Sequence, residues 1–485
     1  MSDPIVVAMM LVTIGVTMGI GIHSYWAART QEQYFAYGGE LRWFVMGLAT
    51  YSTIMSGFGF VGGPGLVYSL GSTSLWMTFA AALGIPLSFL LLGRRLRALA
   101  GPDVITLPDA IHKCYGGSQA ARFSVAVCIL LGIVAYLGSQ ILAAAVVLQD
   151  VFDAGFATAF FAALAVVALY PLIGGIVAGI RTEVFQGAVM ILASVMICYV
   201  ALASGGGMSQ ITAHVASANQ ALVSPWGAAP AMTSLGYLFV FAVGNPGMPH
   251  SVSRFLMLKD ATQLKRSLIL ALTAYMLGSL LWMLLGFTVR AHVAAGDLAP
   301  LAAPDQAAPA FLNNYTPSWL AGIALAGLMS AILSTASIFL NVGAACLTRD
   351  IPLAFNRPVA HPVLWARIWT AVLALASASV AFYSRELVAL LGAIGYGLHA
   401  AGLAPALILG LWWPRATAAG VVASGIVTIA GSIYFFMAQQ LGYAAAYGWW
   451  VPSHGFPSVG LVMLLSFATF ISVSLATPPR TTPAL

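Results

Sequence analysis

The chain has 485 residues, of which 61% are hydrophobic and only 7% are charged. Soluble domains carry about 25% charged residues, so this composition excludes a soluble globular protein and indicates a polytopic membrane protein. The four cysteines lack CxxC spacing, which argues against a zinc site or a disulfide framework. The N-terminal segment lacks the basic region and the cleavage site of a signal peptide, and we expect it to be retained as a first membrane helix.

Apolar stretches of about 20 residues, long enough to span a bilayer, occur thirteen times. A tight turn at the glycines of residues 174–179 separates the fifth from the sixth. The predicted spans are 4–26, 43–70, 74–98, 122–148, 157–176, 182–203, 232–252, 267–289, 316–345, 363–383, 387–412, 416–437 and 456–476.

The lysines and arginines are distributed very unevenly between the two sides of this arrangement. With the N-terminus outside, seventeen of the nineteen fall on one side, and only Arg290 and Arg385 fall on the other. Positive residues concentrate on the cytoplasmic side of membrane proteins. The pattern therefore predicts a multi-pass protein of the cytoplasmic (inner) membrane, with its N-terminus outside and its C-terminus in the cytoplasm. The net charge of +6 is explained by this topology and requires no nucleic-acid partner.

Two of the predicted spans carry glycine and proline in mid-membrane. The first is Ser52–Tyr68, STIMSGFGFVGGPGLVY, and the second is Phe241–His250, FAVGNPGMPH. Glycine costs a helix interior roughly 1 kcal/mol and proline about 3 kcal/mol, so we expect both helices to be interrupted. Backbone groups freed at membrane depth must face protein, water or an ion. Small residues that let helices pack closely are the simpler explanation of the glycines.

The two interrupted helices are the second and the seventh of the thirteen. They open two consecutive sets of five helices, 2–6 and 7–11, and because five is odd the second set is inverted. Matching breaks in the halves of an inverted repeat point to a binding site at the midplane. We therefore predict an all-α transporter that forms a single domain over 1–485. Its first repeat is 43–203, its second is 232–412, and its peripheral helices are 4–26 and 416–476.

Adjacent hydroxyls occur in the ninth helix, at Ser334 and Thr335, with Ser337 following. Neutral oxygens suit a hard cation such as Na⁺, although membrane-helix hydroxyls often bond only the carbonyl four residues earlier. No motif of a hydrolase, a metalloprotease or a nucleotide-binding enzyme is present in the sequence. We therefore expect a protein that is not an enzyme.

Three ionisable residues within the spans have two interpretations each. Glu183 either pairs with the neighbouring Arg181 near a helix N-terminus or contributes to a second ion site. His250, at the inner end of the seventh helix, is either a hydrogen-bonded structural residue or a proton carrier. His399, in the eleventh helix, either lines the transport pathway or makes a packing contact.

Five separated sequence blocks, in order, resemble those of the solute:sodium symporter family. The blocks resemble the branch of this family that contains pantothenate, monocarboxylate and proline carriers. The blocks are residues 55–68 (MSG, FVGGPG and Tyr68), 106–109 (TLPD), 170–187 (YPLIGG to TEVFQG), 247–255 (GMPH and RF) and 331–350 (AILST to TRD).

This resemblance implies a LeuT-type fold of thirteen helices and uptake of a small solute driven by sodium, with no organic cofactor. It implies a sodium site formed by Ser52, Met55, Ala331, Ser334 and Thr335. It also implies a substrate site formed by Ser56, Gly57, Phe58, Tyr136, Gln140, Phe241, Asn245 and Pro249. Candidates for a second ion or a proton are Glu183, Ser337, His250 and His399.

The sequence departs from the family pattern at two positions. Proline carriers have an aspartate where this chain has Ile54, which argues against proline as the substrate. We expect a small carboxylate instead, because a broken helix presents unpaired N–H groups to an anion. Family members that use a second sodium have a hydroxyl where this chain has Ile338, so we expect one sodium per cycle.

Two other interpretations remain open from the sequence. A proton-coupled carrier of the same fold would use Glu183, His250 or His399. A transporter-like sensor would need a signalling domain, for which the tail Thr477–Leu485 leaves no room. The sequence does not indicate the oligomeric state.

Overall fold

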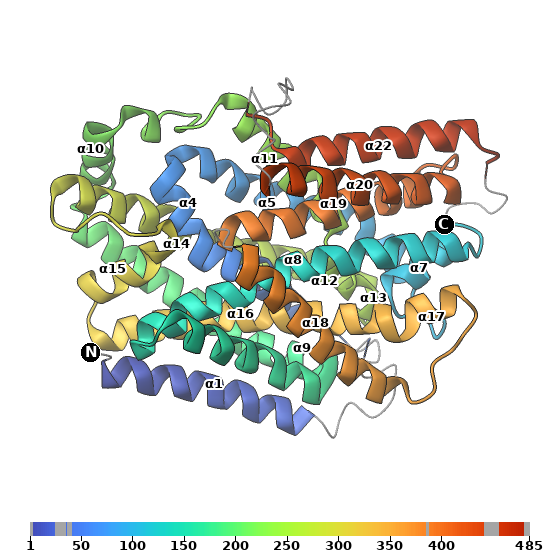
Figure 1. Cartoon of the computed structure of the whole chain (residues 1–485), viewed down its shortest axis with the longest axis horizontal. Coiled ribbons are helices and arrows are strands. Elements are labelled where there is room, and N and C mark those ends of the chain that lie inside the picture. The colour runs from blue at the N-terminus through green and yellow to red at the C-terminus, as the bar shows by residue number, and fades with distance from the viewer. Residues whose placement is uncertain (1–2, 25–34, 36–40, 385–387, 441–454, 480–485) are drawn as a thin grey trace.

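A computed structural model describes residues 3–24, 35, 41–384, 388–440 and 455–479. Over these residues the chain forms long helices aligned with the long axis of the molecule (Figure 1), and the described β-structure consists of two isolated bridges. The long helices are α1 (Pro4–Ser24), α3 (Trp43–Ile54), α4 (Gly63–Leu70), α5 (Leu75–Ser88), α8 (Gln119–Phe152), α9 (Phe156–Ser204), α11 (Ala231–Val243), α14 (Leu264–Ala295), α16 (Ser318–Ala345), α18 (Pro362–Ser384), α19 (Val388–Trp412), α20 (Ala418–Gln440) and α22 (Ser458–Ala476).

The described helices are consistent with thirteen crossings. Ten stretches are long and apolar enough to span a membrane, and two shorter apolar helices, Phe156–Leu169 and Ala231–Val243, add to them. The stretch Phe58–Leu99 counts twice, because the chain turns back at Gly71 (φ 60°). Two hydrogen bonds show that the start of the second helix and the end of the third lie on the same side. Trp43 N donates to the Gln263 side chain, and Arg97 donates to the Lys259 carbonyl, and both acceptors belong to the connection before α14. Arg29, Arg385 and Arg480, which the topology prediction used, lie outside the described residues.

The helix α9 contains the predicted turn between the fifth and sixth spans. Gly175 has φ 56° and ψ −153°, a conformation that residues with a Cβ rarely adopt. Gly175 divides the 49 residues of α9 into two separate helices. The sixth helix therefore begins at this glycine, and Glu183 lies two turns into it rather than at its start.

The break in the second helix lies at Met55–Ser56, before the glycine-rich run that was expected to cause it. Residues from Phe58 onward form a π-helical turn (η3, Phe58–Gly62) and then α4. The glycines in this run permit close packing instead: a Cβ on Gly57 would lie 2.7 Å from Ile332, and one on Gly62 would lie 3.0 Å from Ala389. The chain therefore uses the glycines for packing and breaks the helix one residue earlier.

The break in the seventh helix lies where the sequence predicts it. After α11 the chain forms a 3₁₀ turn (η7, Asn245–Gly247) and then the short helices α12 (Pro249–Val252) and α13 (Arg254–Met257). Pro246 and Pro249 lack the N–H that a continuous helix would need. The two broken helices meet, since the rings of Phe58 and Phe241 stack with centroids 6.0 Å apart.

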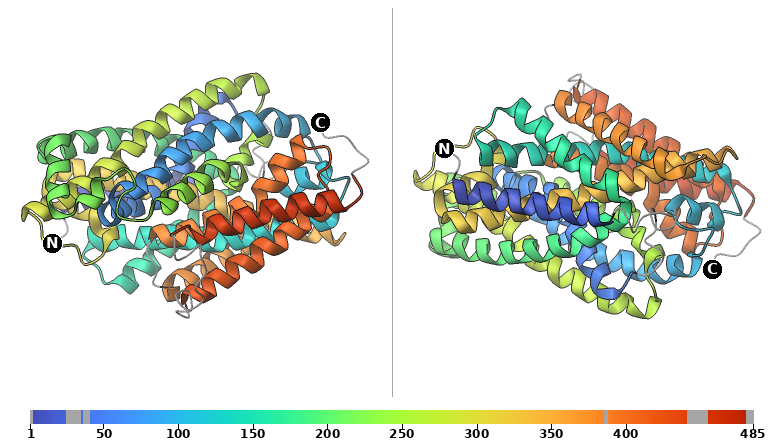
Figure 2. Two further views of the ribbon diagram at one scale, coloured as in Figure 1. Left: turned by 90° about the horizontal axis from the view of Figure 1, so that it is seen from above. Right: turned by 90° about the horizontal axis from the view of Figure 1, so that it is seen from below.

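The helices α8, α16 and α19 form the buried centre, whereas α1, α18, α20 and α22 lie at the periphery (Figures 1 and 2). At one end of the bundle, α7 (Leu107–Cys114) begins with a capping box of Thr106 and Asp109. The buried Asp109 carboxylate accepts from Arg122 at 3.0 Å and from Arg349 at 3.2 Å. These contacts fasten α7 to the start of α8 and to the π-helical turn η10 (Cys346–Asp350) after α16.

At the opposite end, the buried Asp305 carboxylate accepts a hydrogen bond from Val388 N at 2.9 Å. Burial raises the pKa of Asp305 to about 6, although the bond from Val388 acts in the other direction. An acid whose pKa is raised by folding lowers the free energy of unfolding when the pH is above the folded-state pKa. This loss of stability disappears as the pH falls from the folded-state pKa to the pKa of the acid in the unfolded chain. We expect Asp305→Asn to raise the Tm of the purified protein at pH 7.5 and the gain to shrink steadily towards pH 4. A gain that does not depend on pH would contradict this assignment.

Candidate ion and substrate sites

Four of the five predicted sodium ligands meet where α3 ends. The Ser334 hydroxyl donates to the carbonyl of Ser52 at 2.8 Å and to that of Ala331 at 2.9 Å. The Thr335 hydroxyl donates to the carbonyls of Thr53 and Ala331, both at 3.1 Å. All of these residues are fully buried. Thr53, which the sequence analysis did not select, therefore belongs to the same cluster of oxygens.

The position of these oxygens favours a cation. The last carbonyls of a helix lack intrahelical partners, and the helix dipole makes that end negative. Met55 is the C-cap of α3 and donates its N–H to the Tyr51 carbonyl. The helix break therefore begins at Met55, next to these carbonyls. The hydroxyls of Ser334 and Thr335 have lone pairs free to bind a cation, so neutral oxygens from two helices suit Na⁺.

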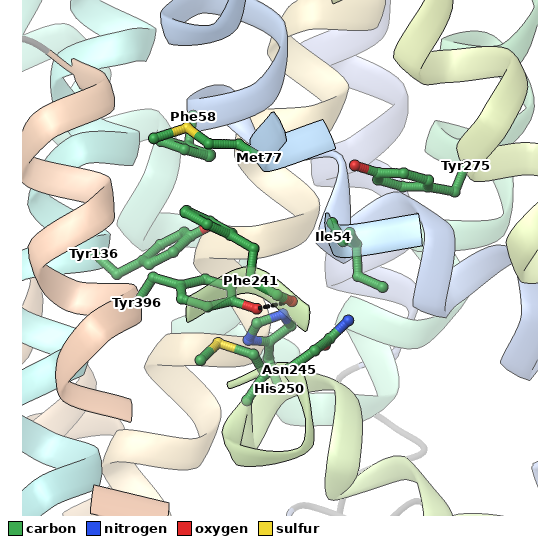
Figure 3. Close-up of a pocket in the computed structure, with 11 residues that line it drawn as sticks. Ile54, Phe58, Met77, Tyr136, Phe241, Asn245, His250, Tyr275 and Tyr396 are labelled. Carbon is green, nitrogen blue, oxygen red and sulfur yellow. Dashed lines mark hydrogen bonds between the residues drawn. The ribbon is translucent and has the colours of Figure 1, made fainter. Parts of the chain in front are cut away.

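A cavity of about 30 Å³ lies between the two helix breaks (Figure 3). Four of the predicted substrate residues line it: Phe58, Tyr136, Phe241 and Asn245. None of its lining side chains is charged. The other lining residues are Ile54, Met77, Ala81, Met248, His250, Tyr275 and Tyr396.

The remaining predicted substrate residues lie behind the cavity wall and hold it in place. The Ser56 hydroxyl lies 3.1 Å from the Tyr136 hydroxyl, and Gly57 N donates to Gln140 Oε1 at 2.8 Å. Pro249 is buried at the start of α12. The contacts of Ser56 and Gly57 brace the broken helix against α8, and none of these four residues lines the cavity.

Several lining residues were not among the predicted substrate residues. Tyr275 comes from α14 and donates its hydroxyl to the Thr78 carbonyl, and Tyr396 comes from α19 and donates to that of Phe241. A tyrosine hydroxyl within a membrane span is a usable signal, because buried polar groups there are costly. Met77 and Ala81 carry no such signal, since they resemble any other apolar residue of α5.

Glu183 pairs with Arg254 and not with Arg181, which contradicts the expected pairing. The Arg254 guanidinium donates to Glu183 at 2.7 Å and to the Thr53 hydroxyl at 2.5 Å, and both charged side chains are buried. Arg181 donates instead to the Ser24 hydroxyl. Arg254 thereby joins the seventh helix to α9 and to the end of α3, next to the ion site.

Two of the other candidates for a second ion or a proton, His250 and His399, contact the same Phe339 ring, whereas Ser337 bonds within α16. The Ser337 hydroxyl donates to the Ser334 carbonyl at 3.0 Å. His250 lines the cavity, with its ring 4.8 Å from that of Phe339. His399 Nε2 lies 3.0 Å from the Ile129 carbonyl oxygen. The His399 ring stacks on the ring of Phe339, with the two ring centroids 5.5 Å apart. His250 therefore reaches the cavity, whereas His399, on α19, packs against α8 and α16.

Two interrupted helices that enclose a cavity beside a cluster of neutral oxygens are the usual construction of a secondary transporter. A sequence profile of the sodium:solute symporter family matches residues 34–428. The chain belongs to this family.

Characterised relatives cover most of the chain. The osmoregulated proline transporter OpuE of Bacillus subtilis is 28% identical over 88% of this chain and 87% of its own length. The sodium/proline symporter of Haemophilus influenzae is 26% identical over 95% and 94%, respectively. The sodium/pantothenate symporter of Escherichia coli is 27% identical over 85% and 86%.

Solved structures share the fold. A Na⁺-coupled sialic acid symporter, solved in a substrate-bound, outward-open state, superposes with a TM-score of 0.78 over the full length of both chains at 18% identity. A nucleobase-cation-symport-1 family transporter in a closed conformation gives a TM-score of 0.53 over 92% of this chain and 95% of its own, at 15% identity. The predicted all-helical inverted-repeat fold is confirmed.

Proposed function

We propose that the protein imports a small organic solute bearing a carboxylate group, one sodium ion moving inward with each solute molecule. The observation that carries the sodium assignment is the contact of the Ser334 and Thr335 hydroxyls with the carbonyls of Ser52 and Thr53 at the end of α3. Carbonyl and hydroxyl oxygens can replace part of the hydration shell of a hard cation. For a zwitterionic solute, the membrane potential adds about 2.3 kcal/mol at 100 mV for the one net charge that moves inward. For a monoanion moved with one sodium ion the net charge is zero, and the sodium gradient alone drives transport.

The carboxylate preference rests on the helix breaks. A broken helix presents N–H groups without intrahelical partners to an anionic group. Both breaks adjoin the cavity, which adds the side chains of Asn245 and His250 as hydrogen-bonding groups. Three relatives are named for proline or pantothenate, and both of these solutes carry a carboxylate. Ile54, an apolar residue in the cavity wall, argues for a solute other than proline.

We propose the orientation that the positive residues predict, with the N-terminus outside and the C-terminus in the cytoplasm. The loops at residues 214 and 262 then face opposite sides of the membrane. In a variant without native cysteines, we expect a cysteine at 214 to react with an impermeant maleimide added outside. A cysteine at 262 should react only after the membrane is opened. Labelling of both from the same side would contradict the arrangement of thirteen helices.

We expect a single sodium ion per cycle. Arg254 already neutralises Glu183, and the position after Ser337 is Ile338, whose side chain offers no oxygen. A second sodium would lack ligands in a site of low dielectric, at a cost of several kcal/mol. Initial uptake rates should therefore follow external sodium with a Hill coefficient near one. A coefficient close to two that falls to one in Glu183→Gln would contradict this stoichiometry.

His250 supports a second candidate, proton-coupled transport, because this ionisable side chain lines the cavity. Uptake of labelled monocarboxylates, pantothenate and amino acids into proteoliposomes separates the two functions. An inward sodium gradient without a pH gradient should drive accumulation if sodium is the coupling ion. Accumulation that follows only an inward proton gradient would favour the alternative.

A further inference from the structure

The helix α16 carries a line of polar groups away from the ion site. Ser334, Ser337 and Asn341 follow one another at spacings of three and four residues, which places them on one face of the helix. Each bonds to the one before: Ser337 donates to the Ser334 carbonyl at 3.0 Å, and Asn341 donates to the Ser337 carbonyl at 2.8 Å. Seven residues of helix span about 10 Å, so Asn341 lies about that far from the ion-site hydroxyl of Ser334.

The line ends at a second cavity of about 20 Å³, lined by residues of α7, α13, α16 and η10 and of the segments next to them. Three of its lining side chains are buried and have oxygens without hydrogen-bond partners. These oxygens are the Ser253 hydroxyl, Asn341 Oδ1 and Asp350 Oδ2. Buried polar atoms are almost always satisfied, so three such oxygens around one cavity indicate a ligand that supplies positive charge or hydrogen-bond donors.

The types of oxygen select the ligand. A hydroxyl, an amide carbonyl and a carboxylate are the groups that bind hard cations. A cavity of 10–15 Å³ already accommodates one water molecule, so a cavity of about 20 Å³ suits an ion of similar size. Arg349 donates to Asp109 and Arg254 to Glu183, so neither of them forms a hydrogen bond with Asp350 Oδ2. The positive charges of Arg349 and Arg122 nevertheless lie near this carboxylate.

We infer that Ser253, Asn341 and Asp350 form an inner cation site that receives the sodium ion after it leaves Ser334 and Thr335. The inference rests on the proposed sodium coupling and on the proposed orientation, in which this end of the bundle faces the cytoplasm. The same ion occupies the two sites in turn, so the inner site is compatible with one sodium per cycle. Ion release then requires α7 to separate from η10, which Thr106 and Asp350 hold together by a hydrogen bond of 2.7 Å.

The test compares sodium dependence at the two faces of the membrane in oriented vesicles. Internal sodium should inhibit uptake of the labelled solute, because it rebinds at the inner site. Asn341→Leu and Asp350→Asn should raise the internal concentration for half-maximal inhibition about tenfold, the change expected when an ion loses one strong ligand. The external concentration for half-maximal uptake should change less than twofold.

Two further variants separate ion binding from folding. Ser253→Ala removes a hydroxyl that has no hydrogen-bond partner, so it should weaken internal inhibition without lowering the Tm. Thr348→Val is the matched control, since its buried hydroxyl is also unpaired but does not line the cavity. It should leave internal inhibition unchanged.

Three outcomes would contradict the inference, and they are distinguishable. Internal inhibition that is the same in all four variants as in the unmodified protein would show that the cavity holds water only. Equal changes at both faces would show a general distortion of the transporter. Uptake that does not depend on sodium in the unmodified protein would overturn the proposed function itself, and the inner site with it.

Discussion

Arg254→Met should abolish uptake and lower the stability of the folded protein by about 3–5 kcal/mol, the usual cost of removing one partner of a buried ion pair. The substitution leaves the Glu183 carboxylate buried without a counter-charge, and it also removes the contact to the Thr53 hydroxyl. Thermal unfolding in detergent and uptake in proteoliposomes measure the two effects. Arg266→Met, at an exposed arginine on α14, is the matched control and should change neither.

The double variant Arg254→Met with Glu183→Gln distinguishes stability from transport. Replacing both members of a buried pair by uncharged groups is often nearly neutral for stability, so the Tm should recover most of its loss. Uptake should stay low, because Thr53 would still lack the guanidinium that holds the end of α3 against α9. A double variant that transports normally would show that the pair serves stability alone.

Ser334→Ala and Thr335→Ala should each raise the sodium concentration for half-maximal uptake by about tenfold or more. Each variant removes one oxygen ligand from the cation, and contacts to charged groups are worth about 1.5–3 kcal/mol. The dependence of the initial uptake rate on external sodium measures the change.

Ser330→Ala provides the control for these hydroxyls. Ser330 lies about one turn before Ser334 on the same helix, is buried, and has no hydrogen-bond partner for its hydroxyl. Its replacement should leave the sodium dependence unchanged. If Ser334→Ala and Thr335→Ala behave like this control, their hydroxyls serve only to join α16 to α3.

The sequence was sufficient to predict the helices, because hydropathy is a strong local signal, whereas the ion site stays a prediction. Hydropathy predicted the spans, and the distribution of positive residues predicted their orientation. The family blocks predicted that Ser334 and Thr335 lie opposite the end of α3. The second helix breaks at Met55–Ser56, within the predicted stretch Ser52–Tyr68 but one residue before its first glycine. The glycines from Gly57 to Gly65 are helical. Glycine is needed there because a Cβ at Gly57, Gly62 or Gly65 would lie 3.0 Å or less from a neighbouring segment.

Contacts between distant segments could not be predicted in the same way. Glu183 and Arg254 are separated by 71 residues in sequence, whereas Arg181 is a sequence neighbour that points elsewhere. Residues of the cavity such as Met77 have the same apolar character as residues that face lipid. Their position depends on how α5 packs against α11, which no periodicity of a nearly uniform apolar helix reveals.

Sodium-driven accumulation of a solute tests the central claim most directly. Proteoliposomes containing the purified protein should concentrate the accepted solute against its own gradient when sodium is imposed outside. They should stop when potassium replaces sodium, and an inside-negative potential should increase the rate if the solute carries no net charge. Accumulation that persists without sodium, at equal pH on both sides, would contradict the assignment of Ser334 and Thr335 to a coupling-ion site.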